Sequence, residues 1–149
     1  MRTAGLIAVW VLLLGWGRES LPGADKEDTN KAQEKLQGKW EWVSQVNDGR
    51  KANPEDAKER PLRIKGEKLF MLFKGEEHEM GTMKLNPEKN PAQIDVTFTD
   101  GPRKGQTAKG IYKLDGDTLS ICVGEKDRPT AFESKAGSGN GLWVLKRAK

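Results

Sequence analysis

The sequence predicts an all-β protein, a small closed antiparallel up-and-down barrel of about eight strands with a short N-terminal helix. Short stretches of alternating apolar and polar residues follow one another at hairpin spacing from Pro61 onward, and they do not alternate with long helical patterns. Gly38 stands two residues before Trp40 in the expected first strand, and Arg147 closes the last one. In a closed barrel this tryptophan fills one end and the arginine lies across its ring. Closure also removes the unpaired edges of an open sheet.

Residues 1–17 have the features of a secretory signal peptide. A positive start at Arg2 is followed by an apolar core over residues 6–14, and Gly15 and Gly17 are small residues that suit a cleavage after Gly17. The alternative is an uncleaved membrane anchor, but the apolar run is shorter than the roughly 20 residues that a membrane-spanning helix needs. We therefore expect an exported protein, periplasmic or extracellular, with no membrane span after cleavage.

The rest of the chain suits one domain, and its composition argues against several classes of protein. The sequence of 149 residues has a formal net charge of +4, from 26 lysines and arginines and 22 aspartates and glutamates. This excess is small and spread along the chain, so we expect no nucleic-acid partner. Cys122 is the only cysteine, which excludes an intrachain disulfide and leaves stability to the hydrophobic core.

The first elements are a polar N-terminal segment and a tryptophan-rich strand. Residues 18–35 predict a flexible tether that ends in a short helix, and the barrel domain is expected over residues 36–149. Alternation in the first strand, residues 38–46, would place Trp40, Trp42, Ser44 and Val46 on one face. Residues 50–60 predict a loop with one helical turn that lies over a barrel mouth.

The other seven strands follow as hairpins. Two-residue turns are expected at Gly66-Glu67 and at Asp115-Gly116, because glycine in these dipeptides suits hairpin turns. The expected strands cover residues 62–65, 69–73, 77–85, 94–99, 106–114, 119–123 and 142–147.

One apolar face of these strands would point into the barrel. An eight-stranded barrel has room for one small ligand, so these residues predict the lining of a hydrophobic pocket open at one mouth. The alternative is that the same side chains fill the interior. Gly38, Trp40 and Arg147 are assigned to structure rather than to binding. The predicted pocket lining is Trp42, Ile64, Met71, Phe73, Val96, Phe98, Tyr112 and Ile121.

Residue patterns for catalysis or metal binding are weak. His78 is the sole histidine and lies among Glu76, Glu77 and Glu79, but a strand puts only two of these four residues on each face. Zinc sites take three or four ligands, so we interpret this segment as a solvated hairpin and expect no metal or other cofactor. Cys122 has no nearby histidine in sequence and is interpreted as a small buried residue. We therefore expect that the protein is not an enzyme.

Several motifs between residues 36 and 147 resemble an uncharacterised secreted lipocalin-like family that is abundant in planctomycete bacteria. The resemblance implies a lipocalin-like barrel and brings no established substrate. Gly38, Trp40 and the terminal Arg147 also resemble the wider lipocalin signature. The motifs are Leu36-Gln37-Gly38-x-Trp40, Gly110-Ile111-Tyr112-x-Leu114-Asp115-Gly116-Asp117-x-Leu119-x-Ile121-Cys122, Arg128-Pro129-Thr130-x-Phe132 and the closing Val144-Leu145-Lys146-Arg147.

Two functional hypotheses follow from the sequence. The first is an exported lipocalin-like protein that binds a small apolar molecule in the barrel interior or at its mouth. The second is an envelope protein–protein interaction module with a filled core, similar to barrel-type protease inhibitors, whose contact surface would be residues 18–35 and the loop 50–60. The expected partners are therefore a small hydrophobic molecule or an envelope protein.

Overall fold

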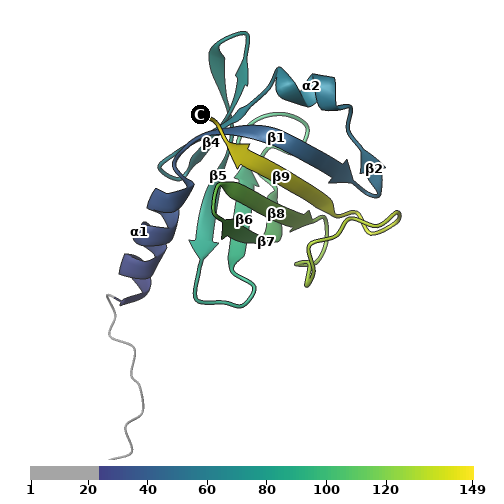
Figure 1. Cartoon of the computed structure of the whole chain (residues 1–149). Coiled ribbons are helices and arrows are strands. Elements are labelled where there is room, and N and C mark those ends of the chain that lie inside the picture. Colours follow the sequence, from purple (N-terminus) through teal and green to yellow (C-terminus); the bar gives the residue numbers. More distant parts are fainter. Residues whose placement is uncertain (1–23) are drawn as a thin grey trace, which may run out of the picture.

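The computed structural model describes residues 24–149, and these residues form a β-barrel with one helix at its N-terminus (Figure 1). The expected signal peptide, residues 1–17, and the first part of the tether, residues 18–23, lie outside the described residues. The helices are α1 (Ala24–Leu36) and α2 (Pro54–Lys58). The strands are β1 (Gly38–Asn47), β2 (Arg50–Lys51), β3 (Leu62–Lys65), β4 (Lys68–Phe73), β5 (Glu76–Asn86), β6 (Gln93–Phe98), β7 (Thr107–Asp115), β8 (Thr118–Gly124) and β9 (Gly141–Arg147).

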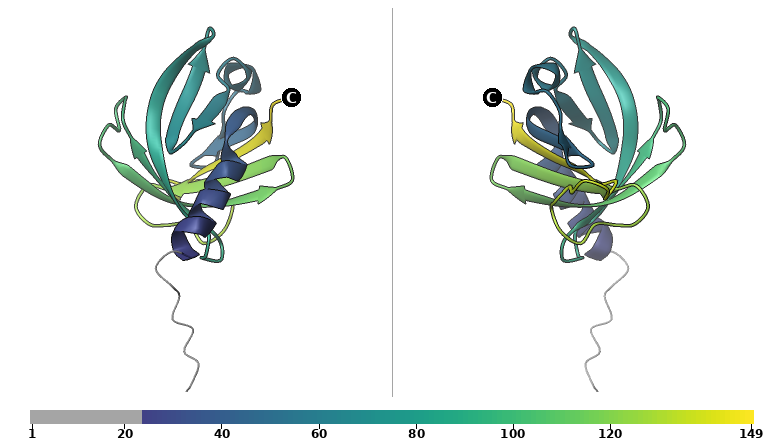
Figure 2. Two further views of the ribbon diagram at one scale, coloured as in Figure 1. Left: turned by 90° about the vertical axis from the view of Figure 1, so that its left-hand side faces the viewer. Right: turned by 90° about the vertical axis from the view of Figure 1, so that its right-hand side faces the viewer.

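The barrel closes between its first and last strands. From β3 to β9 each strand pairs antiparallel with the next, and β1 pairs with β3 on one side and with β9 on the other. The short β2 only extends β1 as a hairpin and does not enter the closed ring. The structure thus confirms the predicted all-β fold, an eight-stranded closed antiparallel barrel with an N-terminal helix. Figure 2 shows the barrel from two sides, with α1 projecting below it.

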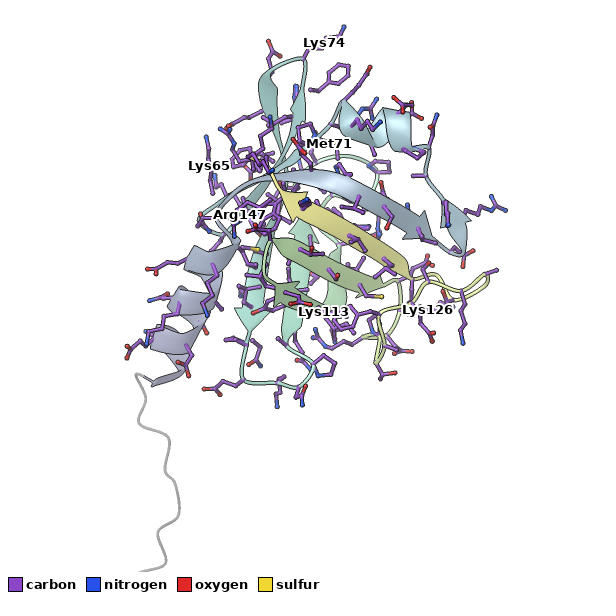
Figure 3. The ribbon with its side chains drawn as sticks, viewed as in Figure 1. Lys65, Met71, Lys74, Lys113, Lys126 and Arg147 are labelled. Atoms are coloured by element: carbon purple, nitrogen blue, oxygen red, sulfur yellow. The ribbon has the colours of Figure 1, made fainter. Side chains whose placement is uncertain are left out.

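The two ends of the barrel differ in what surrounds them. At the end we call the closed end, α1 leads into β1, and the chain finishes after β9 (Figure 1). The opposite end, which we call the open end, carries α2, the β4–β5 hairpin and the loops 99–106 and 125–140. Figure 3 shows Arg147 near α1 and Lys74 at the far tip of the β4–β5 hairpin.

Trp40 fills the closed end. Its indole is fully buried, and its Nε1 donates to the Leu36 carbonyl at the end of α1 over 2.9 Å. The Arg147 guanidinium lies 4.4 Å from the centre of the Trp40 ring and donates to the carbonyls of Lys35 and Gln37 over 2.6 and 2.8 Å. Gly38 has a φ of 119°, a backbone conformation that residues with side chains rarely adopt. Glycine at this position therefore lets the chain turn from α1 into β1 beside Arg147.

Side chains pack the middle of the barrel. They come from every strand of the closed ring, and each is at most 2% exposed, so these side chains form the hydrophobic core. The fully buried side chains that face inward are Trp40, Leu62, Ile64, Leu69, Met83, Ile94, Val96, Ala108, Leu119, Ile121 and Leu145.

A β-bulge in β1 corrects the expected strand pattern. Trp42 pairs with Leu145 and Ser44 pairs with Val144, so Val43 is an extra residue without a partner on β9. A single extra residue reverses the in–out alternation of everything that follows it. The prediction that Ser44 and Val46 share the inward face of Trp40 and Trp42 is therefore wrong.

Candidate functional site

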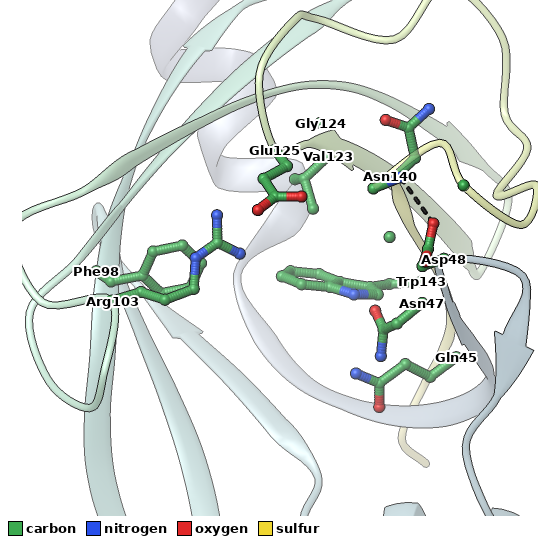
Figure 4. A pocket seen from close by; sticks show the side chains of 13 residues that line it. Gln45, Asn47, Asp48, Phe98, Arg103, Val123, Gly124, Glu125, Asn140 and Trp143 are labelled. Atoms are coloured by element: carbon green, nitrogen blue, oxygen red, sulfur yellow. Dashed lines mark hydrogen bonds between the residues drawn. The ribbon is translucent and has the colours of Figure 1, made fainter.

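A hollow of about 570 Å³ lies at the open end of the barrel (Figure 4). It is formed by the last residues of β1, the end of β6, the loops that follow β6 and β8, and the beginning of β9. Its volume is in the range of small-molecule sites in proteins. The lining residues are Gln45, Asn47, Asp48, Phe98, Arg103, Val123, Gly124, Glu125, Gly137, Gly139, Asn140, Gly141 and Trp143.

Trp143 is the largest apolar side chain in this lining. It points inward from β9, pairs with Gln45 of β1 and is 8% exposed. Its ring meets the ring of Trp42 edge to face, with 6.0 Å between the centroids and an angle of 76° between the planes. This geometry is favourable for two aromatic rings. The two tryptophans therefore form a rigid aromatic surface between the packed core and the open end.

The β1 bulge decides which polar groups reach the hollow. Because Val43 shifts the alternation, Gln45 and Asn47 point into the open end and Val46 points to the outer face. Figure 4 shows the two amide side chains below the indole of Trp143. Amide groups donate and accept hydrogen bonds, so they suit the polar part of a ligand.

Arg103 stands on the other side of the hollow. Its guanidinium lies 4.7 Å from the centre of the Phe98 ring, and its Nε donates to the Gln106 side chain over 3.5 Å. The loop that carries it is closed at its base, since Gly105 N donates to the Phe98 carbonyl and Phe98 N donates to the Gln106 carbonyl. The Phe98 ring and the short loop together place the guanidinium at the edge of the hollow.

The loop 125–140 forms the outer wall and is tied to the β1–β2 turn. Asp48 accepts a hydrogen bond from Gly139 N through Oδ1 over 2.8 Å, and its own N–H donates to the Asn140 carbonyl over 2.8 Å. A Cβ at Gly49 would lie 2.6 Å from the Ala136 nitrogen, so only glycine lets the β1–β2 turn come this close to the loop 125–140. These contacts join segments far apart in sequence and give the hollow a defined rim.

The indole N–H of Trp143 is buried without a hydrogen-bond partner. A Cβ placed on Gly141 would lie 3.3 Å from this nitrogen and 2.9 Å from Asn47 Oδ1, so both polar atoms lie beside a position that has no side chain. Buried donors in proteins are nearly always paired, and an unpaired one is costly. The unpaired donor is therefore enclosed beside Gly141, Asn47 and Val123 rather than open to the hollow.

A second, more apolar hollow of about 330 Å³ lies between the β4–β5 hairpin and Arg60, two residues after the end of α2. Its lining includes Arg60, Met71, Phe73 and His78, and Phe73 is 36% exposed. The Arg60 guanidinium lies 5.2 Å from the Phe73 ring centre, and the Arg60 carbonyl accepts a 2.8 Å hydrogen bond from Trp42 Nε1. Trp42 therefore contacts one lining residue of each hollow, Trp143 of the first and Arg60 of the second.

The eight residues predicted to line a pocket occupy three regions. Phe98 lines the first hollow, Met71 and Phe73 line the second, and Trp42 lies between them. Ile64, Val96 and Ile121 are at most 1% exposed in the packed core. Tyr112 lies at the closed end beside α1, and its burial raises the pKa of its hydroxyl. The structure brings Trp42, Met71, Phe73 and Phe98 to the open end and leaves the other four away from it.

Sequence reasoning missed most of the hollow. Trp143 alternates with Leu145 in the last strand, so the same period-two pattern identifies it as inward-facing. Gln45 and Asn47 require the bulge, and Arg103 and Glu125 lie in loops where no periodic pattern exists. Of the residues that the sequence missed, Trp143 and Val123 are thus the ones that it could have identified, because Val123 alternates with Leu119 and Ile121 in the same way.

His78 and its neighbouring glutamates form no compact cluster. The His78 Nε2 atom lies 3.9 Å from Glu76 Oε2 on the exposed hairpin. Glu77, on the other face, accepts from Lys65 and Arg63 at 2.7 and 2.8 Å, and these contacts, the Lys65 hydrogen bond above all, lower its pKa. Within residues 24–149, no three His, Cys, Asp or Glu side chains lie close enough together to hold a metal ion.

Cys122 faces away from the hollow. It lies on the outer side of β8 with no exposed surface, and its Sγ donates to the Glu133 carbonyl over 3.4 Å. Burial raises the pKa of the thiol, which disfavours the reactive thiolate form. The segment that contains Glu133 covers this part of the sheet, where Lys113 lies 4.6 Å from the Phe132 ring centre.

The two segments considered as a protein contact surface lie at opposite ends of the barrel. The described part of the tether, in α1, is at the closed end, and α2 of the loop 50–60 is at the open end (Figure 1). They therefore do not form one continuous surface.

No protein-family model, no curated protein and no solved structure matches this chain. In the part of the chain that the structure describes, no helix has the length and apolar character needed to cross a membrane.

Proposed function

We propose that this chain is an exported lipocalin-like binding protein that holds a small, mostly apolar molecule at the open end of its barrel and carries out no catalysis. The ligand rests on Trp143 and Phe98, with the polar side chains of the rim around it. Export is proposed from the signal-peptide pattern of residues 1–17. The lipocalin-like assignment is proposed from the resemblance of residues 36–147.

One observation carries the proposal. The barrel is packed with side chains through its middle, yet at the open end it has a hollow of about 570 Å³ whose lining includes the indole of Trp143. Small-molecule sites are concave and combine apolar surface with polar groups that fix the orientation of the ligand, and in this lining three apolar side chains, Trp143, Phe98 and Val123, lie among polar and charged ones. The edge-to-face contact with Trp42 holds this surface rigid, which reduces the entropy lost on binding.

Intrinsic tryptophan fluorescence tests the proposal. The mature chain has three tryptophans, and Trp42 and Trp143 lie at the open end whereas Trp40 lies at the closed end. We expect a panel of small lipids and pigments to include compounds that shift or quench the emission. Trp143→Ala should weaken their binding by about tenfold or more, because aromatic anchors dominate the affinity of well-packed sites.

The matched control is Trp40→Phe, which changes a tryptophan at the other end of the barrel. This variant should bind the same compounds as the wild type with unchanged affinity. Native mass spectrometry of protein purified from its own host without detergent provides an independent measurement, in which a bound molecule appears as a discrete added mass. No fluorescence response to any compound, together with a mass equal to that of the polypeptide, would reject the proposed function.

A further inference from the structure

We infer that the ligand of the open end is a small amphiphile with a single negative charge, and that its carboxylate is bound by Arg103. This inference rests on the proposed function and adds to it the chemical class of the ligand. The apolar part of the molecule lies against Trp143, Phe98 and Val123, all of which line the same hollow.

The first argument is that Arg103 has no carboxylate partner. No Asp or Glu oxygen within residues 24–149 lies within ion-pair distance of its guanidinium, although Glu125 lines the same hollow. Arg103 shares this with Arg50 and Arg60, whereas the three other arginines among the described residues each have such a partner. These pairs are Arg63 with Glu77 at 2.8 Å, Arg128 with Asp95 at 2.8 Å and Arg147 with Asp117 at 3.6 Å.

The second argument is the way in which Arg103 is held. Its Nε donates to Gln106 and its flat face lies on Phe98, so the two terminal nitrogens are left to donate into the hollow. Figure 4 shows this end of the guanidinium directed towards the space above Trp143. Two parallel N–H groups match the two oxygens of a carboxylate, and a guanidinium that is already in place loses little freedom when it binds one.

The acidic residues of the rim limit the charge of the ligand. Glu125 and Asp48 line the hollow together with Arg103. The carboxylates of Glu125 and Asp48 would repel a second negative charge on the ligand, which is therefore disfavoured. A carboxylate carries one charge, whereas a phosphate monoester carries nearly two at pH 8. A carboxylate therefore meets less repulsion from Glu125 and Asp48 than a phosphate monoester does.

The test compares three probes with the same ten-carbon chain. Decanoate, decanol and decyl phosphate are titrated at pH 8 into the mature protein, below their micelle concentrations, with tryptophan fluorescence as the readout. We expect decanoate to bind about tenfold or more tightly than decanol, which is the scale of one charge-assisted hydrogen-bond pair, and more tightly than decyl phosphate. Arg103→Gln should abolish the preference for decanoate over decanol.

Two variants serve as controls. Arg63→Gln removes an arginine that is paired on the outer wall, and it should keep the full preference for decanoate. Glu125→Gln removes a negative charge from the rim, and it should tighten the binding of decyl phosphate more than that of decanol.

The possible failures are distinguishable. If none of the probes binds and the wider panel also gives no response, the proposed function itself is rejected. If decanol binds as tightly as decanoate, or if Arg103→Gln keeps the preference, the proposed function stands and the role of Arg103 is rejected. If decyl phosphate binds most tightly, the single charge of the ligand is rejected.

Discussion

Arg147 shows at the scale of one residue how the closed end is held. Its guanidinium covers the Trp40 ring and bonds two carbonyls at the junction of α1 and β1, so one side chain joins the last strand to the start of the barrel. Lysine lacks the planar group that makes these contacts together. The contact between Arg147 and Trp40 therefore stabilises barrel closure as well as the position of the helix.

Replacing Arg147 should destabilise the whole barrel. We expect Arg147→Met to lower the free energy of unfolding by about 2–4 kcal/mol, from the loss of charge-assisted hydrogen bonds and of the cation–π contact. Arg147→Lys should give a smaller loss because it keeps the charge. Urea unfolding measures both, with Lys146→Met on the neighbouring exposed side chain as the control. Equal stability of the Arg147→Met and Lys146→Met variants would contradict this account.

At the scale of one element, the bulge in β1 is the feature that shapes the open end. Val43 is the extra residue, and it is 57% exposed. Because of it, Trp42 and Gln45 both face inward although they are three residues apart. A regular strand would instead present Ser44 and Val46 to the hollow, a smaller and more apolar pair than Gln45 and Asn47.

Single-residue deletions in β1 test this register. Deleting Val43 leaves Trp42 opposite Leu145 and Ser44 opposite Val144 without an unpaired residue, so the protein should fold with a loss of about 2 kcal/mol or less. Deleting Glu41 makes Trp40 and Trp42 adjacent, so that one of them must face outward, and the protein should not fold cooperatively. Thermal unfolding followed by near-ultraviolet circular dichroism distinguishes the two. Cooperative unfolding of the Glu41 deletion would show that the register is not set in this way.

At the scale of the whole molecule, the helix and the proposed binding site lie at opposite ends of the barrel. α1 contacts the barrel at its closed end, where the buried Leu36 is its last residue, and the hollow is at the open end. We therefore expect the affinity for a ligand at the open end not to depend on the N-terminal segment.

Truncation of the segment provides the test. Deleting residues 18–35 keeps Leu36 and its hydrogen bond to Trp40 but removes the Lys35 carbonyl that Arg147 contacts. We expect a loss of about 1–3 kcal/mol in unfolding free energy and an unchanged affinity, within twofold, for the compounds that bind at the open end. Fluorescence titration and urea unfolding measure the two quantities. A large loss of affinity in a folded truncated protein would place part of the site on α1.

The hairpins and the strand order follow from local sequence. The turns at Gly66 and Gly116 occur where glycine was expected, and each has the positive φ of a tight hairpin turn. Period-two alternation in the strands beside these turns places Leu62, Ile64, Leu119 and Ile121 in the core. These features are short-range, because a turn and its two flanking strands lie within a few residues of one another.

The sequence by itself thus determined that this chain forms an antiparallel barrel, since turn chemistry and period-two alternation are local properties. Only the tertiary structure decided where the hollow lies and what lines it. The bulge at Val43 is visible only against the register of β9, a strand about a hundred residues away. Alternating strand direction puts the loops after β6 and β8, with Arg103 and Glu125, at one end, but only barrel closure brings the end of β1 beside β9 to complete the lining.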